Sequence, residues 1–315
     1  MNSHLRSLCR PRSTAVLAIL AAESVLLTLF TPVQTVHGET VADRLWIWGH
    51  PAGVYNDSYL APLAKTSSIE PVAAAQSMGL RNMIFVQYNG LPKPPLDDYY
   101  RPFQKLDRVY WSLVAAGGTT SEAQREAVYR LAEQQPNVAG FILDDFFHGH
   151  VSDPLERGES PAVSAPFDAS LTPEQLRAIR QRTVGDRQLP LMAVVYTGQI
   201  SPRARRHLDE VDQVCLWTWR PDDLENLEAH LAALEKLIPK KPIFLGCYMY
   251  DFHGRRPLPL SRMRQQAELG YRWIREGRIE GMIFLATPNV DVGLEAVEWT
   301  RDWIAKIGQE HLKPQ

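Results

Sequence analysis

The chain has 315 residues, and its 34 lysine and arginine residues nearly balance its 36 aspartate and glutamate residues, for a formal net charge of -2. Proteins that bind nucleic acids usually carry a basic excess or a basic stripe, so this balance argues against a nucleic-acid partner. The hydrophobic fraction of 45% is ordinary for a globular protein with a sizeable core.

The N-terminal segment differs from the rest of the chain. Basic residues precede an apolar run over residues 14–30, and Val36 and Gly38 suit the small-residue positions before a cleavage site. This order is typical of a secretory signal peptide, so we predict a signal peptide over residues 1–38 and a secreted or periplasmic mature protein. The alternative is an uncleaved signal anchor, because the run is nearly long enough to span a bilayer. Glu23, in the middle of the run, argues against a stable span.

The mature chain, residues 39–315, alternates short apolar runs with segments of helical spacing. The runs are rich in Val, Ile, Phe, Tyr and Trp and too short for typical globular helices, which favours strands. The eight predicted strand runs cover residues 44–50, 81–89, 106–114, 138–147, 189–198, 213–219, 241–251 and 280–289. Helical spacing covers residues 67–79, 120–135, 171–184, 221–238, 259–277 and 293–308. The proline-rich segment at residues 90–105 is predicted to be a loop.

This alternation predicts the fold class. Eight strands with crossover helices in about 250 residues match a single-domain (β/α)8 TIM barrel. A doubly wound open sheet also alternates strands and helices. No run is followed by a glycine-rich dinucleotide loop, however, and a count of eight favours a closed barrel.

The C-terminal ends of the predicted strands turn aromatic and polar, whereas their beginnings are almost purely aliphatic. In such barrels the chemistry lies at the C-terminal strand ends. Sugars suit this mixture, because their C–H faces pack on aromatic rings and their hydroxyls need polar partners. The alternative is that the aromatic side chains only seal the barrel. The predicted substrate-binding residues are Trp48, His50, Tyr88, Trp111, His148, Tyr196, Trp217, Trp219, Arg220, Tyr248, Tyr250 and Asn289.

Three carboxylates are the predicted catalytic groups. Asp144 and Asp145 end the fourth run, and Asp251 ends the seventh, on a roughly opposing side of the mouth. Glycoside hydrolysis uses a pair of carboxyl groups, one protonating the leaving oxygen and one attacking or activating water. Because side chains alternate along a regular strand, we expect one member of the adjacent pair to face the pocket. The other would bind backbone amides or a neighbouring histidine or arginine.

The histidines after the acidic pair raise a metal-site alternative. His148, His150 and Asp153 offer suitable ligands within a short span. Three or four ligands from one flexible loop are unusual, so we predict no metal and no other cofactor, and expect these histidines to bind substrate or orient the carboxylates. Residues 148–170 are rich in Pro, Ser and Gly and lack periodicity, which is typical of a lid or binding loop.

Two cysteines remain in the predicted mature chain. Cys215 and Cys247 both lie inside apolar strand-like runs. A single disulfide is possible in an oxidising compartment, but we expect two buried free thiols. Neither cysteine has the spacing of a metal ligand.

Two short motifs resemble known glycoside hydrolases. "GFILDD", residues 140–145, resembles the fourth-strand segment of chitinase-like family 18 enzymes, and "YMYD", residues 248–251, resembles their Met-Tyr-Asp motif. In this alignment Phe146 stands where that family has its catalytic Glu, and "YMYD" lies one strand later. Acids on strands four and seven also resemble the retaining-glycosidase clan, which uses Glu at both places. The segment at residues 275–304 resembles an uncharacterised bacterial family.

These observations lead to three hypotheses. The first is an exported glycoside hydrolase that acts on a polysaccharide or oligosaccharide by a two-carboxylate mechanism. The second is a non-catalytic carbohydrate-binding barrel, because no Glu stands at a predicted strand end. The third is a metal-dependent hydrolase that uses His148, His150 and an aspartate.

Overall fold

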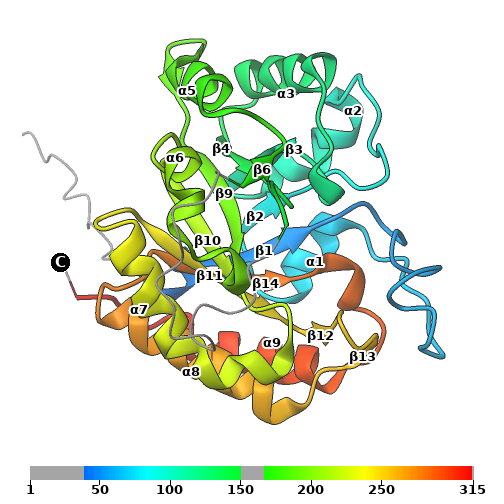
Figure 1. Ribbon diagram of the computed structural model, residues 1–315. Coiled ribbons are helices and arrows are strands. Elements are labelled where there is room, and N and C mark those ends of the chain that lie inside the picture. Colours follow the sequence, from blue (N-terminus) through cyan, green and yellow to red (C-terminus); the bar gives the residue numbers. More distant parts are fainter. Residues whose placement is uncertain (1–38, 150–166, 314–315) are drawn as a thin grey trace, which may run out of the picture. The chain divides into compact units, whose positions relative to one another are not determined.

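The computed structural model describes residues 39–149 and 167–313 (Figure 1). The predicted signal peptide therefore lies outside the described residues. So does most of the predicted lid loop, of which only the two ends are described.

Eight parallel strands form a closed barrel. In chain order they are β1 (Leu45–Gly49), β2 (Asn82–Phe85), β3 (Arg108–Val114), β4 (Val138–Leu143), β9 (Leu191–Tyr196), β10 (Gln213–Trp217), β11 (Ile243–Tyr248) and β14 (Gly281–Leu285). Each lies within one of the eight predicted runs. The first strand pairs with the last in parallel, with Trp46 opposite Ile283, which closes the sheet. The predicted (β/α)8 TIM barrel is confirmed, and the open doubly wound sheet is wrong.

Helices connect the strands and surround the barrel (Figure 1). They are α1 (Pro71–Ser77), α2 (Asp97–Tyr100), α3 (Glu122–Gln134), α5 (Pro173–Gln181), α6 (Arg205–Leu208), α7 (Leu227–Leu237), α8 (Leu260–Arg275) and α9 (Glu295–Ile307). The six predicted helical segments each contain one of them. The amphipathic pattern explains this agreement, since each helix buries one apolar stripe against the barrel. Within the described ranges, no helix is both long and apolar enough to cross a membrane.

Two local predictions differ from the structure. Residues 90–105 are not entirely a loop, because α2 and a 3-10 helix at Arg101–Lys105 fold there. The predicted seventh strand does not continue to residue 251. Strand β11 ends at Tyr248, and β12 (Tyr250–Asp251) leaves the barrel to pair antiparallel with β13 (Arg256–Pro257). The aromatic, β-favouring composition is shared by both strands, so composition alone hides the break.

Aromatic side chains fill the N-terminal half of the barrel interior. Trp46 meets Tyr110 edge to face at 5.1 Å between ring centroids, and it meets Phe244 at 6.1 Å. Tyr110 reaches across the interior and donates a hydrogen bond to Gln213 at 3.0 Å. Gly140 makes this possible, because a Cβ at that position would lie 2.5 Å from the Tyr110 ring. The interior below the mouth is therefore packed rather than hollow.

The two cysteines of the barrel are free. Cys215 on β10 and Cys247 on β11 are both buried and form no disulfide. The predicted free thiols are confirmed, and burial raises the pKa of both thiols.

Candidate active site

A cavity of about 70 Å³ lies at the C-terminal ends of the barrel strands. It brings together nine of the predicted site residues: Trp48, His50, Tyr88, Asp144, Asp145, Tyr196, Trp217, Trp219 and Tyr248. Five further residues line it: Tyr55, Tyr59, Ala116, Phe252 and Leu285. The lining is therefore a set of aromatic rings around two carboxylates.

Both members of the adjacent acidic pair line the cavity, against the expectation that only one would do so. Strand β4 ends at Leu143, and Asp145 adopts a left-handed backbone conformation with a φ of 45°. The strand alternation that separates neighbouring side chains therefore stops before the pair. Asp144 is 6% exposed, and Asp145 is half-buried nearer the solvent.

Two donors hold the Asp145 carboxylate. The backbone N–H of Gly117 donates to Oδ2 at 2.8 Å, and the Tyr196 hydroxyl donates to Oδ1 at 2.7 Å. Gly117 has a φ of 71°, which a glycine adopts without steric cost, and this turn aims its N–H at the carboxylate. Asp145 thus both lines the cavity and binds a backbone amide, two roles that the strand pattern predicts for different members of the pair.

Burial raises the pKa of the Asp144 carboxyl well above its ordinary value, and the neighbouring charge of Asp145 raises it further. A hydrogen bond from the Asp145 backbone counteracts these effects in part. A carboxyl group in apolar surroundings beside a second carboxylate tends to keep its proton at neutral pH. Asp144 is therefore suited to donate a proton.

Tyrosine hydroxyls extend the polar network from the acids. Tyr196 binds Asp145, and it also hydrogen-bonds the hydroxyl of Tyr248. Burial raises the pKa of both tyrosines, and the nearby carboxylates raise it further, so both stay neutral and can donate. The network links the ends of β4, β9 and β11 across one side of the mouth.

His50 is a fixed, neutral part of the cavity wall. Its Nδ1 donates to the carbonyl of Val86 at 2.8 Å, and its Nε2 accepts from the Trp48 indole at 3.0 Å. Burial lowers the pKa of this imidazole to about 4. Both ring nitrogens bind protein groups, which fixes the orientation of the imidazole. The ring packs edge to face against Tyr55 and Tyr88 in the cavity wall.

The floor of the cavity depends on one glycine of β11. The ring of Trp217 lies over Gly246, where a Cβ would come within 2.1 Å of it. Trp217 then meets Trp48 at 5.3 Å and Tyr248 at 4.9 Å between ring centroids. Its indole N–H binds the sulfur of Cys215 at 3.3 Å.

Sequence reasoning missed the rings that come from loops. Tyr55 and Tyr59 follow β1, and Phe252 follows β12. These three rings contact one another edge to face, with centroids 5.0–5.3 Å apart. The four-residue spacing of the two tyrosines directly after a predicted strand end is a signal that could have identified them.

Six predicted site residues lie outside the cavity lining, and Asp251 is the most consequential. Its side chain is buried in the turn after β12, where it accepts from the backbone N–H of Gly254 at 2.7 Å and from Arg256 at 2.9 Å. The structure therefore does not bring Asp251 together with the adjacent acidic pair. Its hydrogen bonds to Gly254 and Arg256 stabilise the turn from which Phe252 lines the cavity.

The other five also do not line the cavity. Trp111 packs with Phe103 outside the cavity, and Tyr250 donates its hydroxyl to the Tyr59 carbonyl. The remaining three are an exposed Arg220, a fully buried Asn289 and an exposed His148, which lies 3.1 Å from the Ser170 hydroxyl. For the metal hypothesis, His150 and Asp153 lie outside the described residues. Within the described ranges, no group of three histidine, cysteine or acidic residues gathers as metal ligands.

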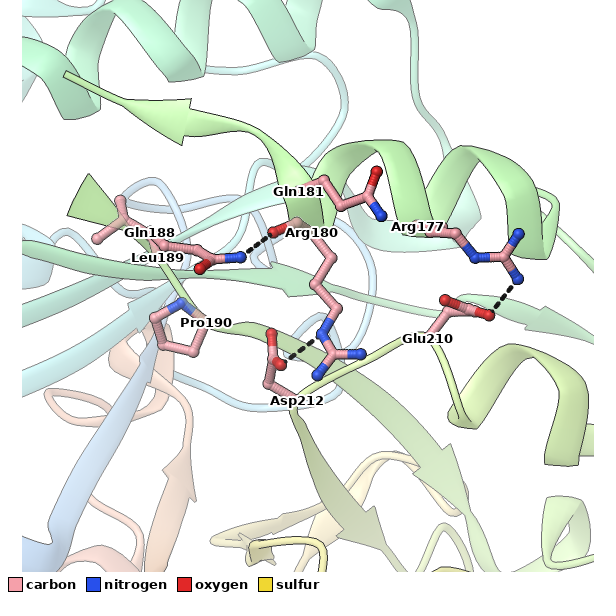
Figure 2. Close-up of a pocket in the computed structure, with 8 residues that line it drawn as sticks. All are labelled: Arg177, Arg180, Gln181, Gln188, Leu189, Pro190, Glu210 and Asp212. Carbon is pink, nitrogen blue, oxygen red and sulfur yellow. Dashed lines mark hydrogen bonds and ion pairs between the residues drawn. The ribbon is translucent and has the colours of Figure 1, made fainter. Parts of the chain in front are cut away.

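A larger hollow of about 540 Å³ lies at the opposite end of the barrel (Figure 2). Its basic residues on α5 are paired, Arg177 with Glu210 at 2.5 Å and Arg180 with Asp212 at 2.6 Å. Asp212 also accepts from the backbone N–H of Leu191 at the start of β9. These pairs tie α5 to the strand beginnings, the end of such barrels associated with stability.

Comparison with known proteins supports the fold. No family model matches the chain, and no curated protein matches it. A protein of Bacteroides thetaiotaomicron assigned as an α-L-fucosidase superimposes with a TM-score of 0.50 and 14% identity, over 75% of this chain and 86% of that chain. AbfB, a family 51 α-L-arabinofuranosidase of Bifidobacterium longum, gives 0.51 and 10%, over 85% of this chain and 73% of that chain. The chain thus shares its barrel fold with these two proteins.

Proposed function

We propose that the protein is an exported glycoside hydrolase that acts on a polysaccharide or oligosaccharide. The observation that carries the proposal is the acidic pair in the aromatic cavity. Asp144 is buried with a raised pKa, and Asp145 lies beside it with its carboxylate held by two donors. Such pairs separate the tasks of acid and base in glycosidases.

The roles follow from the surroundings of each acid. Asp144 is the general acid, since its carboxyl retains a proton that it can give to the glycosidic oxygen. Asp145 is the second carboxylate, which acts on the anomeric carbon or on a water. This assignment replaces Asp251 of the initial hypothesis with Asp145, because Asp251 binds its own turn.

The substrate would bind mainly at the rim. Ligand cavities usually measure about 300–1,000 Å³, and this one has only about 70 Å³. One group of the sugar therefore enters the cavity, while the ring packs against the half-buried side chains of Tyr59, Tyr88 and Trp219. Apolar sugar faces stack favourably on such rings.

The test is hydrolysis of a panel of neutral, acetylated and unacetylated oligosaccharides, measured as released reducing ends. Asp144→Asn and Asp145→Asn should each lower kcat/KM by about 100- to 10,000-fold, the usual contribution of acid–base catalysis. Asp209→Asn is the matched control, because its exposed carboxylate pairs with Arg205 on α6 and does not line the cavity. Unchanged cleavage by both variants would rule out these residues as catalysts. Binding without cleavage of any glycan would instead support a non-catalytic carbohydrate-binding barrel.

Export is tested separately from catalysis. Cleavage after Gly38 would leave Glu39 as the first residue of the exported protein. Mass spectrometry of protein recovered from the periplasm or the medium should show that N-terminus. Membrane-bound protein with residues 1–38 intact would favour the signal-anchor alternative.

A further inference from the structure

The charge of the cavity restricts what it can bind. Two carboxylates line it, and the lining residues that the structure describes include no lysine or arginine. The guanidinium of Arg255 lies outside the lining, 5.9 Å from the centroid of the Tyr59 ring. An anionic group, such as a uronate or a sulfate, would meet two acids there and no cation. The cavity is therefore unsuited to acidic sugars.

The walls of the cavity are aromatic on nearly every side. Neighbouring rings stand almost perpendicular, with interplanar angles of 83° between Tyr55 and Tyr88 and 80° between Trp219 and Tyr248. Rings arranged in this way enclose a small volume instead of forming one flat stacking platform. Aromatic enclosures of this kind bind ammonium groups, because the π faces attract a cation.

Burial of Asp144 adds an energetic argument. A carboxyl group that is 6% exposed and adjacent to a second acid is costly to ionise. Asp144 therefore keeps its proton, and a cation bound beside the Asp145 carboxylate is favourable there, whereas an anionic group is not. The small volume also suits one charged substituent better than a whole sugar ring.

We propose that the cavity binds an alkylammonium group, and that the substrate is a carbohydrate containing amino sugars with free, unacetylated amines. This inference rests on the proposed function for its choice of a sugar as the source of the ammonium group. The ammonium is held by the charge of the Asp145 carboxylate and by the rings of Tyr55, Tyr88 and Trp217, while Asp144 keeps the proton that the proposed function assigns to it.

The experiment compares two monosaccharides that differ only at the amine. Binding of glucosamine and of N-acetylglucosamine to the purified protein is followed by tryptophan fluorescence at about pH 6, since three tryptophans line the cavity. A desolvated cation–π contact predicts about 10- to 30-fold tighter binding of glucosamine. Tetramethylammonium should compete with it. Monosaccharides contain no bond for the enzyme to cleave, so binding is measured apart from catalysis.

Variants locate the site. Asp145→Asn should weaken glucosamine binding about tenfold and leave N-acetylglucosamine within twofold, whereas Asp209→Asn should change neither. Equal binding of the two sugars, or tighter binding of the acetylated one, would overturn the inference. Binding of tetramethylammonium but not of glucosamine would overturn the amino-sugar source. Cleavage of neutral glycans without preference for free amines would sink this inference but not the proposed function, and amine-selective binding without any cleavage would do the reverse.

Discussion

The buried histidine of the cavity wall predicts a specific loss of stability in acid. His50 is 3% exposed, and both ring nitrogens are engaged, by the Val86 carbonyl and the Trp48 indole. Protonation of Nε2 would place a charge in an apolar wall and turn the acceptor of the Trp48 hydrogen bond into a donor. The folded protein therefore resists protonation of this imidazole, while the unfolded chain does not.

The magnitude follows from the pKa difference. Burial lowers the pKa of His50 from 6.5 to about 4 in the folded protein. A shift of that size corresponds to about 3 kcal/mol, at ~1.4 kcal/mol for each pKa unit. The sign is fixed by which state binds the proton more tightly, here the unfolded state. The stabilising contribution is complete above about pH 6.5 and is lost as the pH falls toward about 4.

Urea unfolding of the wild type and of His50→Gln, measured at several pH values between about 4 and 7.5, tests this reasoning. The free energy of unfolding of the wild type should fall by about 3 kcal/mol more than that of the variant across this range. Groups that titrate in both proteins cancel in the comparison. His253→Gln removes an exposed histidine and should keep the wild-type slope. Parallel curves for wild type and His50→Gln would refute the argument.

Three further predictions concern the acidic pair, its hydrogen-bond donor Tyr196 and the floor of the cavity. Asp144→Asn should raise the free energy of unfolding relative to the wild type, more at about pH 7 than near about pH 4. The reason is that the raised pKa of Asp144 in the folded protein favours the unfolded chain, which ionises this carboxyl more readily, as the pH rises above about 4. Equal gains at both pH values in urea titrations would contradict the prediction. Tyr196→Phe removes a donor to Asp145 and should lower kcat/KM about 10- to 100-fold, with a wild-type rate as the contrary result. Gly246→Ala should displace the Trp217 ring and lower the free energy of unfolding by about 1–3 kcal/mol, measured by thermal or urea unfolding. An unchanged free energy of unfolding would contradict this.

The sequence predicts the barrel well because its signals are local and repeated. Each strand is a short β-branched and aromatic run, and each intervening helix has its own apolar stripe. Eight such units leave few alternatives to a closed barrel. The positions of Trp48, Trp217 and Tyr248 followed from the same logic, since they stand at strand ends and share the parity of the barrel interior.

The remaining features depend on backbone geometry that residue types do not reveal. The left-handed conformation of Asp145 decides that both acids face the cavity, and an aspartate can also adopt other conformations at such a turn. Asp251 does not line the cavity because the barrel strand β11 ends before Met249. The next strand, β12, forms a hairpin with β13, in which Asp251 lies opposite Arg256, five residues later. Trp111 has the opposite parity on its strand and packs outward, which only the exact strand register specifies.

The aromatic side chains that fill the N-terminal half of the barrel determine how molecules can reach the cavity. Because Trp46, Tyr110 and Phe244 pack together in the interior beneath the cavity, the residues that the structure describes leave no passage along the barrel axis. Any molecule that enters the cavity must therefore leave through the same mouth. If the protein cleaves glycans as proposed, each product must leave the mouth before the next substrate can bind there. Product release would then limit how fast the next turnover can begin.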